Sequence, residues 1–202
     1  RNMGQVCISA SRFLVQESIA DRFIEVFVKT VGTLRMGNGK EPGTDVGPLA
    51  NRRRLDATDA LVQDALGKGA QLAFGGKRPE DRDKGFFYLP TVLTDVKQSM
   101  KVMFEEPFAP IAPITTFTDL EDALKKANAT EFGLAGYVFT ENTRTAFLAS
   151  EGLDVGMIGV NNLVIATAEI PFGGVKLSGY GREGGSEGIL GYTHAKYINI
   201  KL

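Results

Sequence analysis

Apolar and polar residues follow two different rhythms along this chain. In four segments the apolar residues recur at every third or fourth position, as Ile19, Phe23 and Val26 do, which is typical of a helix with one buried face. Other segments are short and rich in β-branched or aromatic residues, which favours strands. We predict helices over residues 17–32, 51–67, 120–128 and 142–152, and strands over residues 12–16, 70–74, 87–93, 111–117, 133–140 and 157–160.

The order of these elements predicts the fold class. Strands and helices alternate, which favours an α/β fold with an open, mainly parallel sheet and helices on both of its faces. The residues at both ends of the helix predicted over 17–32 suit those positions. Ser18 can serve as its N-cap, and Gly32 can end it. We see no internal repeat in the sequence and no low-complexity segment.

The last thirty residues differ in character from the rest. Residues 173–191 are rich in glycine without a clear period, and we interpret them as an ordered loop whose backbone approaches other groups closely. Residues 192–202 alternate in polarity and predict an edge strand, which can pair with another chain. We therefore predict a main domain over residues 1–191 and a C-terminal strand for oligomer contact over residues 192–202.

Composition narrows the class of protein. Of 202 residues, 43% are hydrophobic and 23% are charged, as in an ordinary globular protein, and the net charge of −1 offers nothing to attract nucleic acid. The basic run Arg52-Arg53-Arg54 predicts a solvated helix face. The sequence contains no apolar run near the roughly 20 residues that span a bilayer, so we expect no membrane contact. A single cysteine excludes an internal disulfide and indicates a reducing, cytoplasmic compartment.

That cysteine, Cys7, follows a glycine-containing turn, Asn2-Met3-Gly4-Gln5, and precedes a strand-like run. A thiol is reactive as the thiolate, and backbone N–H groups that point at sulfur favour this form. The turn could expose such groups, so Cys7 is a candidate nucleophile. The alternative is that Cys7 is a small buried hydrophobic residue, as most lone cysteines are.

The pair Glu105-Glu106 is the second chemical candidate. Adjacent carboxylates before Pro107 must point in different directions, so one of them can bind a ligand; the alternative is a surface turn. Residues 179–184 match the pattern G-x-G-x-x-G, but they lack the preceding buried strand and the later acidic residue of a dinucleotide fingerprint. His194, the single histidine, is expected to be structural or exposed, and no metal site is predicted.

Four motifs in order resemble those of the aldehyde dehydrogenase superfamily. Arg1-Asn2-Met3-Gly4-Gln5-Val6-Cys7, with Arg12 five residues later, is similar to its nucleophile segment. The other three motifs are similar to its Glu-Glu-x-Phe-Gly-Pro, Tyr-Gly-Leu-Ala and Pro-Phe-Gly-Gly-x-Lys-x-Ser-Gly stretches, and they occupy residues 105–110, 132–140 and 171–179. The resemblance spans essentially the whole chain, and its nearest branch is succinate-semialdehyde dehydrogenase.

The resemblance implies a function and a set of site residues. Residues 1–191 would be a catalytic domain that uses NAD or NADP to oxidise an aldehyde to a carboxylic acid through a thioester on Cys7. Glu106 would accept hydrogen bonds from the nicotinamide ribose, and Phe108 and Leu134 would lie beside the nicotinamide. Phe172 would line the substrate tunnel. Homo-oligomers, dimers or tetramers, are expected.

Two further expectations follow from the resemblance. Arg1 matches an arginine that binds the substrate carboxylate in the semialdehyde branch, whereas Ala166 stands where that branch has a serine donor, so a semialdehyde and a neutral aldehyde both stay open. The general base and the oxyanion asparagine of the family would lie outside this chain, which we expect to be part of a longer polypeptide and inactive alone. The alternative function is a non-catalytic assembly module derived from the same fold.

Overall fold

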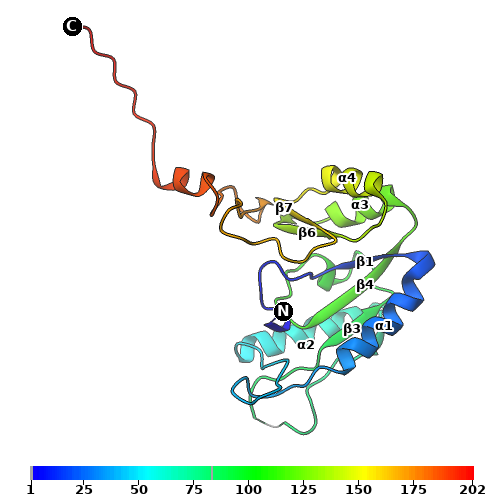
Figure 1. The fold of residues 1–202 in the computed structure, drawn as a ribbon. Helices are drawn as coiled ribbons and strands as arrows, with labels where there is room; N and C mark the ends of the chain where they lie inside the picture. The colour runs from blue at the N-terminus through cyan, green and yellow to red at the C-terminus, as the bar shows by residue number, and fades with distance from the viewer. Residues whose placement is uncertain (1, 83) are drawn as a thin grey trace. The chain divides into compact units, whose positions relative to one another are not determined.

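The computed structural model describes residues 2–82 and 84–202. These residues form two compact units, Arg1–Thr130 and Glu131–Leu202 (Figure 1). The first unit contains three α-helices, α1 (Ala20–Gly32), α2 (Arg52–Gly67) and α3 (Leu120–Asn128). Its strands are β1 (Phe13–Gln16), β2 (Gln71–Phe74), β3 (Thr91–Thr94) and β4 (Ile111–Phe117), and its 3₁₀ turns are η1 (Asn2–Gly4), η2 (Glu17–Ile19) and η3 (Lys101–Met103).

The four strands of the first unit form one sheet in the order β1-β4-β3-β2. The central strand β4 pairs in parallel with β1 on one side and with β3 on the other, and only β2 runs antiparallel. The predicted α/β class with a mainly parallel sheet is therefore confirmed. Phe13 pairs with Ile114, which places the start of β1 beside the middle of β4.

Helices cover both faces of this sheet. Val92 and Leu93 are neighbours on β3 whose side chains point to opposite faces, and each belongs to a different core. Leu93 packs in a core with residues of α2, whereas Val92 packs in a core with residues of α1. Both side chains are almost fully buried, and each such burial stabilises the fold by about 1.5–3 kcal/mol.

A side chain caps α3, whereas the N-cap predicted for α1 is wrong. Asp119 accepts a hydrogen bond from the N–H of Asp122 at the start of α3. Ser18 does not cap α1, because it lies inside the 3₁₀ turn η2 that leads directly into the helix. The Glu17 carbonyl at the start of that turn accepts from the N–H of Ala20, so the turn itself satisfies part of the helix start.

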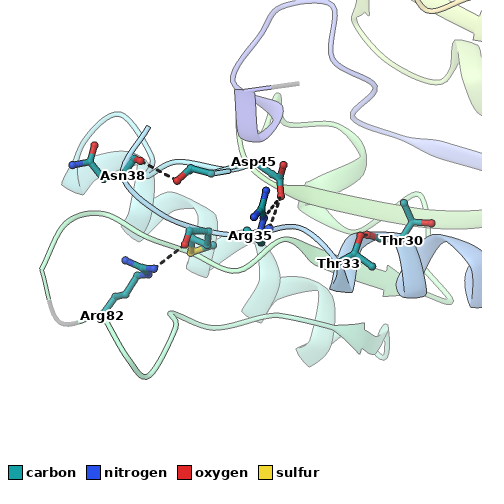
Figure 2. Close-up of polar contacts among 8 residues, drawn as sticks. Thr30, Thr33, Arg35, Asn38, Asp45 and Arg82 are labelled. Carbon is teal, nitrogen blue, oxygen red and sulfur yellow. Dashed lines mark hydrogen bonds and ion pairs between the residues drawn. The ribbon is translucent and has the colours of Figure 1, made fainter. Parts of the chain in front are cut away.

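A polar network holds the loop between α1 and α2 (Figure 2). The Asp45 carboxylate accepts from the backbone N–H of Arg35 at 2.9 Å, and Arg82 donates to the carbonyl of Met36 at 2.8 Å. Further along, the fully buried Leu49 donates its N–H to the carbonyl of Phe86. These contacts fix the path by which the chain enters α2.

The second unit contains the helix α4 (Thr143–Gly152), the strands β5 (Phe132–Gly133), β6 (Ala135–Val138), β7 (Met157–Val160) and β8 (Val175–Lys176), and the 3₁₀ turn η4 (Glu187–Tyr192). β6 and β7 pair in parallel, and β5 and β8 pair antiparallel. The single strand predicted over residues 133–140 is therefore two strands that meet at Leu134. The division arises because Gly133 pairs with Val175 whereas Ala135 pairs with Met157.

Residues 193–202 form no strand within this single chain (Figure 1). The side chains of Tyr197, Ile198 and Ile200 are exposed by 65–87%. A strand needs a neighbour to accept its backbone hydrogen bonds, and no backbone hydrogen bond joins residues 194–202 to another described residue. The predicted role of residues 192–202 in oligomer contact, and the functional boundary at residue 191, stay predictions. No helix in the described part of the chain is long and apolar enough to cross a membrane.

Candidate active site

Cys7 lies in a tight loop at the start of the first unit, the Cys7 loop (residues 2–9). Asn2, Met3 and Gly4 all have positive φ angles, of 47°, 55° and 71°. The N–H of Gln5 donates to the carbonyl of Asn2 at 3.0 Å and closes the turn, while the side chain of Met3 is buried and anchors it. Cys7 itself is exposed, so within this unit a reagent or substrate can reach it.

The Glu106 loop (residues 105–110) approaches the sheet just before β4. Pro107 and Ala109 are buried, whereas Glu105 and Glu106 are both exposed. Glu105 lies 4.0 Å from the ammonium of Lys101. Glu106 has no hydrogen bond or ion pair to any described residue, so its carboxylate is available to accept donors from a ligand. The two carboxylates therefore differ in their contacts, and neither of them is buried.

The two loops are in contact. A Cβ atom on Gly4 would lie 2.2 Å from the carbonyl oxygen of Ala109, so glycine is required for this approach. A hollow of about 490 Å³ opens beside this contact. Phe108 lines it together with residues of the Cys7 loop and of the α2 start; the full lining is Asn2, Gln5, Pro48, Ala50, Asn51, Arg53, Arg54 and Phe108. The structure thus brings together the segments that carry Cys7, Glu106 and Phe108.

The start of α2 tethers both loops. The Gln5 side-chain oxygen accepts from the N–H of Ala50 at 2.9 Å, which fixes the Cys7 loop. Arg54 donates through Nη1 to the carbonyl of Pro107 at 2.6 Å, which fixes the Glu106 loop. Asn51 caps the helix between these tethers by accepting from the N–H of Arg54.

Sequence reasoning missed the role of this helix start. The run Arg52-Arg53-Arg54 predicted a solvated face, which is right for the exposed Arg52 and Arg53 and wrong for the half-buried Arg54. Successive helical residues are about 100° apart around the axis, so three of them cannot share one face. That rotation is the signal that could have singled out one of the three arginines.

Arg12 anchors the end of the Cys7 segment. Its guanidinium donates to the carbonyls of Lys126 and Ala127 at 3.3 and 2.7 Å, at the C-terminal end of α3. A cation at this end of a helix is favoured by the helix dipole. Burial lowers the pKa of Arg12 below its ordinary value.

Leu134 and Phe172 belong to the second unit. Leu134 is half-buried at the junction of β5 and β6, where its carbonyl accepts from the N–H of Met157. Phe172 is half-buried and forms two backbone hydrogen bonds with Glu183, of 2.6 and 2.8 Å. The roles of Leu134 and Phe172 beside a nicotinamide and an aldehyde stay predictions.

The remaining candidates divide into three cases. Arg1, predicted to bind a substrate carboxylate, lies outside the described residues. His194 and Ala166 are exposed. Within residues 2–82 and 84–202, no three side chains of His, Cys, Asp or Glu gather in a way that could hold a metal ion.

Comparison with known proteins identifies the class to which this fold and this cysteine loop belong. The model of the aldehyde dehydrogenase family matches residues 1–198. The chain belongs to the aldehyde dehydrogenase family.

Particular relatives can be named within that family. The chain is 48% identical over 200 residues to a succinate-semialdehyde dehydrogenase of Paenarthrobacter nicotinovorans, covering 99% of this chain and 44% of the relative. The crystal structure of an E. coli NADP dependent enzyme matches at a TM-score of 0.95 and 40% identity, over 99% of this chain and 41% of that one.

A third relative carries a cofactor in its crystal structure. A betaine aldehyde dehydrogenase from Staphylococcus aureus, in complex with NAD+, matches at a TM-score of 0.94 and 36% identity. The match covers 100% of this chain and 42% of that one. The chain thus spans less than half the length of each of these relatives.

Proposed function

We propose that this chain supplies the catalytic part of an NAD- or NADP-dependent aldehyde dehydrogenase, with Cys7 as the nucleophile. The observation that carries the proposal is the contact between the Cys7 loop and the Glu106 loop at the start of α2. An exposed thiol and an unpartnered carboxylate on loops that touch suit a reaction in which a substrate on sulfur meets a cofactor held by its ribose.

The residues of this chain would act in sequence. The Cys7 thiolate attacks the aldehyde carbon, the C=O π electrons move to oxygen, and a thiohemiacetal forms on sulfur. NAD(P)+ would supply the hydride acceptor when bound, and loss of the hydride from that carbon would leave a thioester on Cys7. Water then adds to the thioester carbonyl, the C–S bond breaks, and the carboxylic acid and the free thiol are released.

The cofactor fits the residues that are present. Both oxygens of the exposed Glu106 carboxylate can accept from the two hydroxyls of a ribose, and a carboxylate offers no competing donor. Phe108 lines the adjacent hollow and can pack against a planar ring. Glu106 would thus orient the ribose, and Phe108 would limit the positions of the nicotinamide. The role of Leu134 beside the nicotinamide rests on the family resemblance alone.

The substrate is proposed to be an aldehyde that reacts with Cys7. The role of Phe172 in substrate binding rests on the family resemblance alone. A semialdehyde is favoured by the 48% identity to a succinate-semialdehyde dehydrogenase and by Arg1, which can bind a carboxylate. Ala166 cannot supply the serine donor of that branch. A neutral aldehyde is the competing substrate, and the ratio of kcat/KM for succinate semialdehyde to that for butanal distinguishes the two.

The decisive experiment uses the complete polypeptide to which this chain belongs. With aldehyde and NAD+ or NADP+, the wild type should form the reduced nicotinamide, whereas Cys7→Ala should lose at least about 1,000-fold in kcat, because no covalent step is left. Retention of turnover by Cys7→Ala would contradict the proposal. We expect residues 1–202 alone to form no reduced nicotinamide.

A second function, assembly, is favoured by the exposed apolar tail. We propose that residues 195–200 add a strand to the sheet of a second copy, giving a dimer or a tetramer, since their backbone is unpaired here and Tyr197 is 87% exposed. Removal of residues 193–202 should lower the mass of the complete protein in solution to that of a smaller assembly. An unchanged mass would contradict this. A cytoplasmic location stays a prediction.

A further inference from the structure

Arg54 is the one of the three consecutive arginines that turns inward. Arg52 is exposed and pairs with Asp56 one turn along α2, at 2.9 Å, and Arg53 is also exposed. Arg54 is half-buried, and its Nη1 donates to the carbonyl of Pro107 at 2.6 Å. A charged donor makes this a stronger hydrogen bond than one between neutral groups.

The residue that follows this carbonyl has an unusual backbone. Phe108 has a φ of 42°, in the left-handed region that bulky side chains rarely adopt. Such a conformation is unfavourable, and it persists only where surrounding contacts hold it in place. A relaxed Phe108 would turn the ring and shift the neighbouring Glu106.

The described contacts identify what holds this turn. Ala109 is held from one side by Gly4, whose Cα packs against its carbonyl. Glu105 is held by its N–H, which donates to the carbonyl of Lys101 at 2.8 Å. Between these points, Arg54 is the side chain that contacts the peptide joining Pro107 to Phe108.

We propose that Arg54 is a positioning residue for the cofactor: by holding the Pro107 carbonyl, it keeps Phe108 and Glu106 in the geometry that binds the nicotinamide ribose. This inference rests on the proposed function, because it assigns Glu106 and Phe108 to the nicotinamide nucleotide. The inference concerns only the nicotinamide and its ribose, not the rest of the dinucleotide. Arg54 acts through a backbone carbonyl, so the role requires its reach and its charged donor group.

The test uses the complete polypeptide and a pair of matched substitutions. Arg54→Met keeps the aliphatic length of the side chain without a donor, and Arg54→Lys keeps a donor. Calorimetric titration should show that Arg54→Met raises the Kd for NAD+, or for NADP+ if that is the cofactor used, about tenfold. Arg54→Lys should recover part of the loss. Arg52→Ala, on the exposed side of the same helix, is the control and should leave the Kd unchanged.

Two readouts separate positioning from a general structural role. AMP, which lacks the nicotinamide ribose, should bind wild type and Arg54→Met equally. In a double-mutant cycle with Glu106→Gln, the two losses in NAD(P)+ affinity should be clearly less than additive, because both disturb one contact. Additive losses, or an equal loss of AMP affinity, would overturn the proposal.

The outcomes also separate this inference from the proposed function. If the wild-type protein forms reduced nicotinamide and loses this activity with Cys7→Ala, while Arg54→Met binds NAD(P)+ normally, the function stands and the role of Arg54 fails. If the wild type binds no nicotinamide nucleotide at all, the proposed function fails, and the role of Arg54 fails with it.

Discussion

At the scale of single residues, the candidate site depends on a close backbone contact that leaves no room for a side chain. Gly4 is the clearest case, because its Cα packs against the Ala109 carbonyl and its φ is +71°. An added Cβ would meet backbone atoms that cannot move away, as the far end of a flexible side chain could. The contact between the Cys7 loop and the Glu106 loop is therefore specified by the absence of a side chain.

Substitution of Gly4 tests this contact. Gly4→Ala should lower the free energy of unfolding by about 2–4 kcal/mol, from left-handed strain and overpacking together, and should lower kcat as Cys7 moves. Urea unfolding and steady-state kinetics of the complete protein measure both effects. Gly39→Ala is the control, because its added Cβ would meet no atom within 4 Å and Gly39 has no positive φ. Equal effects of the two substitutions would contradict the interpretation.

At the scale of elements, α2 is the helix that organises the site. One side of it fills the core of the first unit with Leu61 and Val62, and its start tethers both the Cys7 loop and the Glu106 loop. Asn51 contributes to both the helix and the site. Its side-chain oxygen caps the helix by accepting from the N–H of Arg54 at 2.9 Å, and the residue also lines the hollow. The position of the site therefore depends on where this helix begins.

Removal of that cap gives a second prediction. Asn51→Ala should lower the free energy of unfolding by about 1 kcal/mol, and Asn51→Asp should retain most of the stability because a carboxylate also caps. Chemical unfolding of the complete protein measures both. Asn142→Ala, which removes the equivalent cap of α4, is a matched comparison that should cost a similar amount without weakening NAD(P)+ binding. No loss of stability in either alanine variant would contradict the role of the caps.

The elements also show how far the sequence predicts this fold. Residues 111–117 and 120–128 were predicted with the limits that the structure has, because periodicity and capping are local signals. The break at Leu134 was missed, because it depends on pairing between Gly133 and Val175, which lie far apart in the sequence. The inward turn of Arg54 was missed for the same reason, since its partner Pro107 lies beyond two strands.

At the scale of the whole molecule, stability should depend on pH through three aspartates. Hydrogen bonds lower the pKa of Asp45, Asp64 and Asp122; the leading donors are the Arg35 backbone N–H for Asp45, Lys68 for Asp64 and Lys126 for Asp122. A carboxyl whose pKa is depressed in the folded state contributes stability above its unfolded pKa of about 4. That stability is lost as the pH falls through the lower folded pKa.

The free energy of unfolding of the complete protein should therefore decrease as the pH is lowered from about 5 towards 2. Asp64→Asn should flatten this dependence, and Lys68→Met should flatten it to a similar degree, because it removes the donor to the same carboxylate at 2.8 Å. Unfolding in urea at a series of pH values measures the slope. An unchanged slope in both variants would show that the pair does not contribute.

The pairing of β1 with β4 has a consequence for folding while the protein is being synthesised on the ribosome. Phe13 pairs with Ile114, so the strand that follows Cys7 has no partner until about one hundred more residues have been synthesised. At about 5–20 residues per second, this interval lasts on the order of ten seconds. During it the nascent chain carries a cysteine without its surrounding loop contacts. Cys7 is thus among the first residues of this segment to leave the ribosome, whereas the strand that follows it is among the last elements of the first unit to gain its partner.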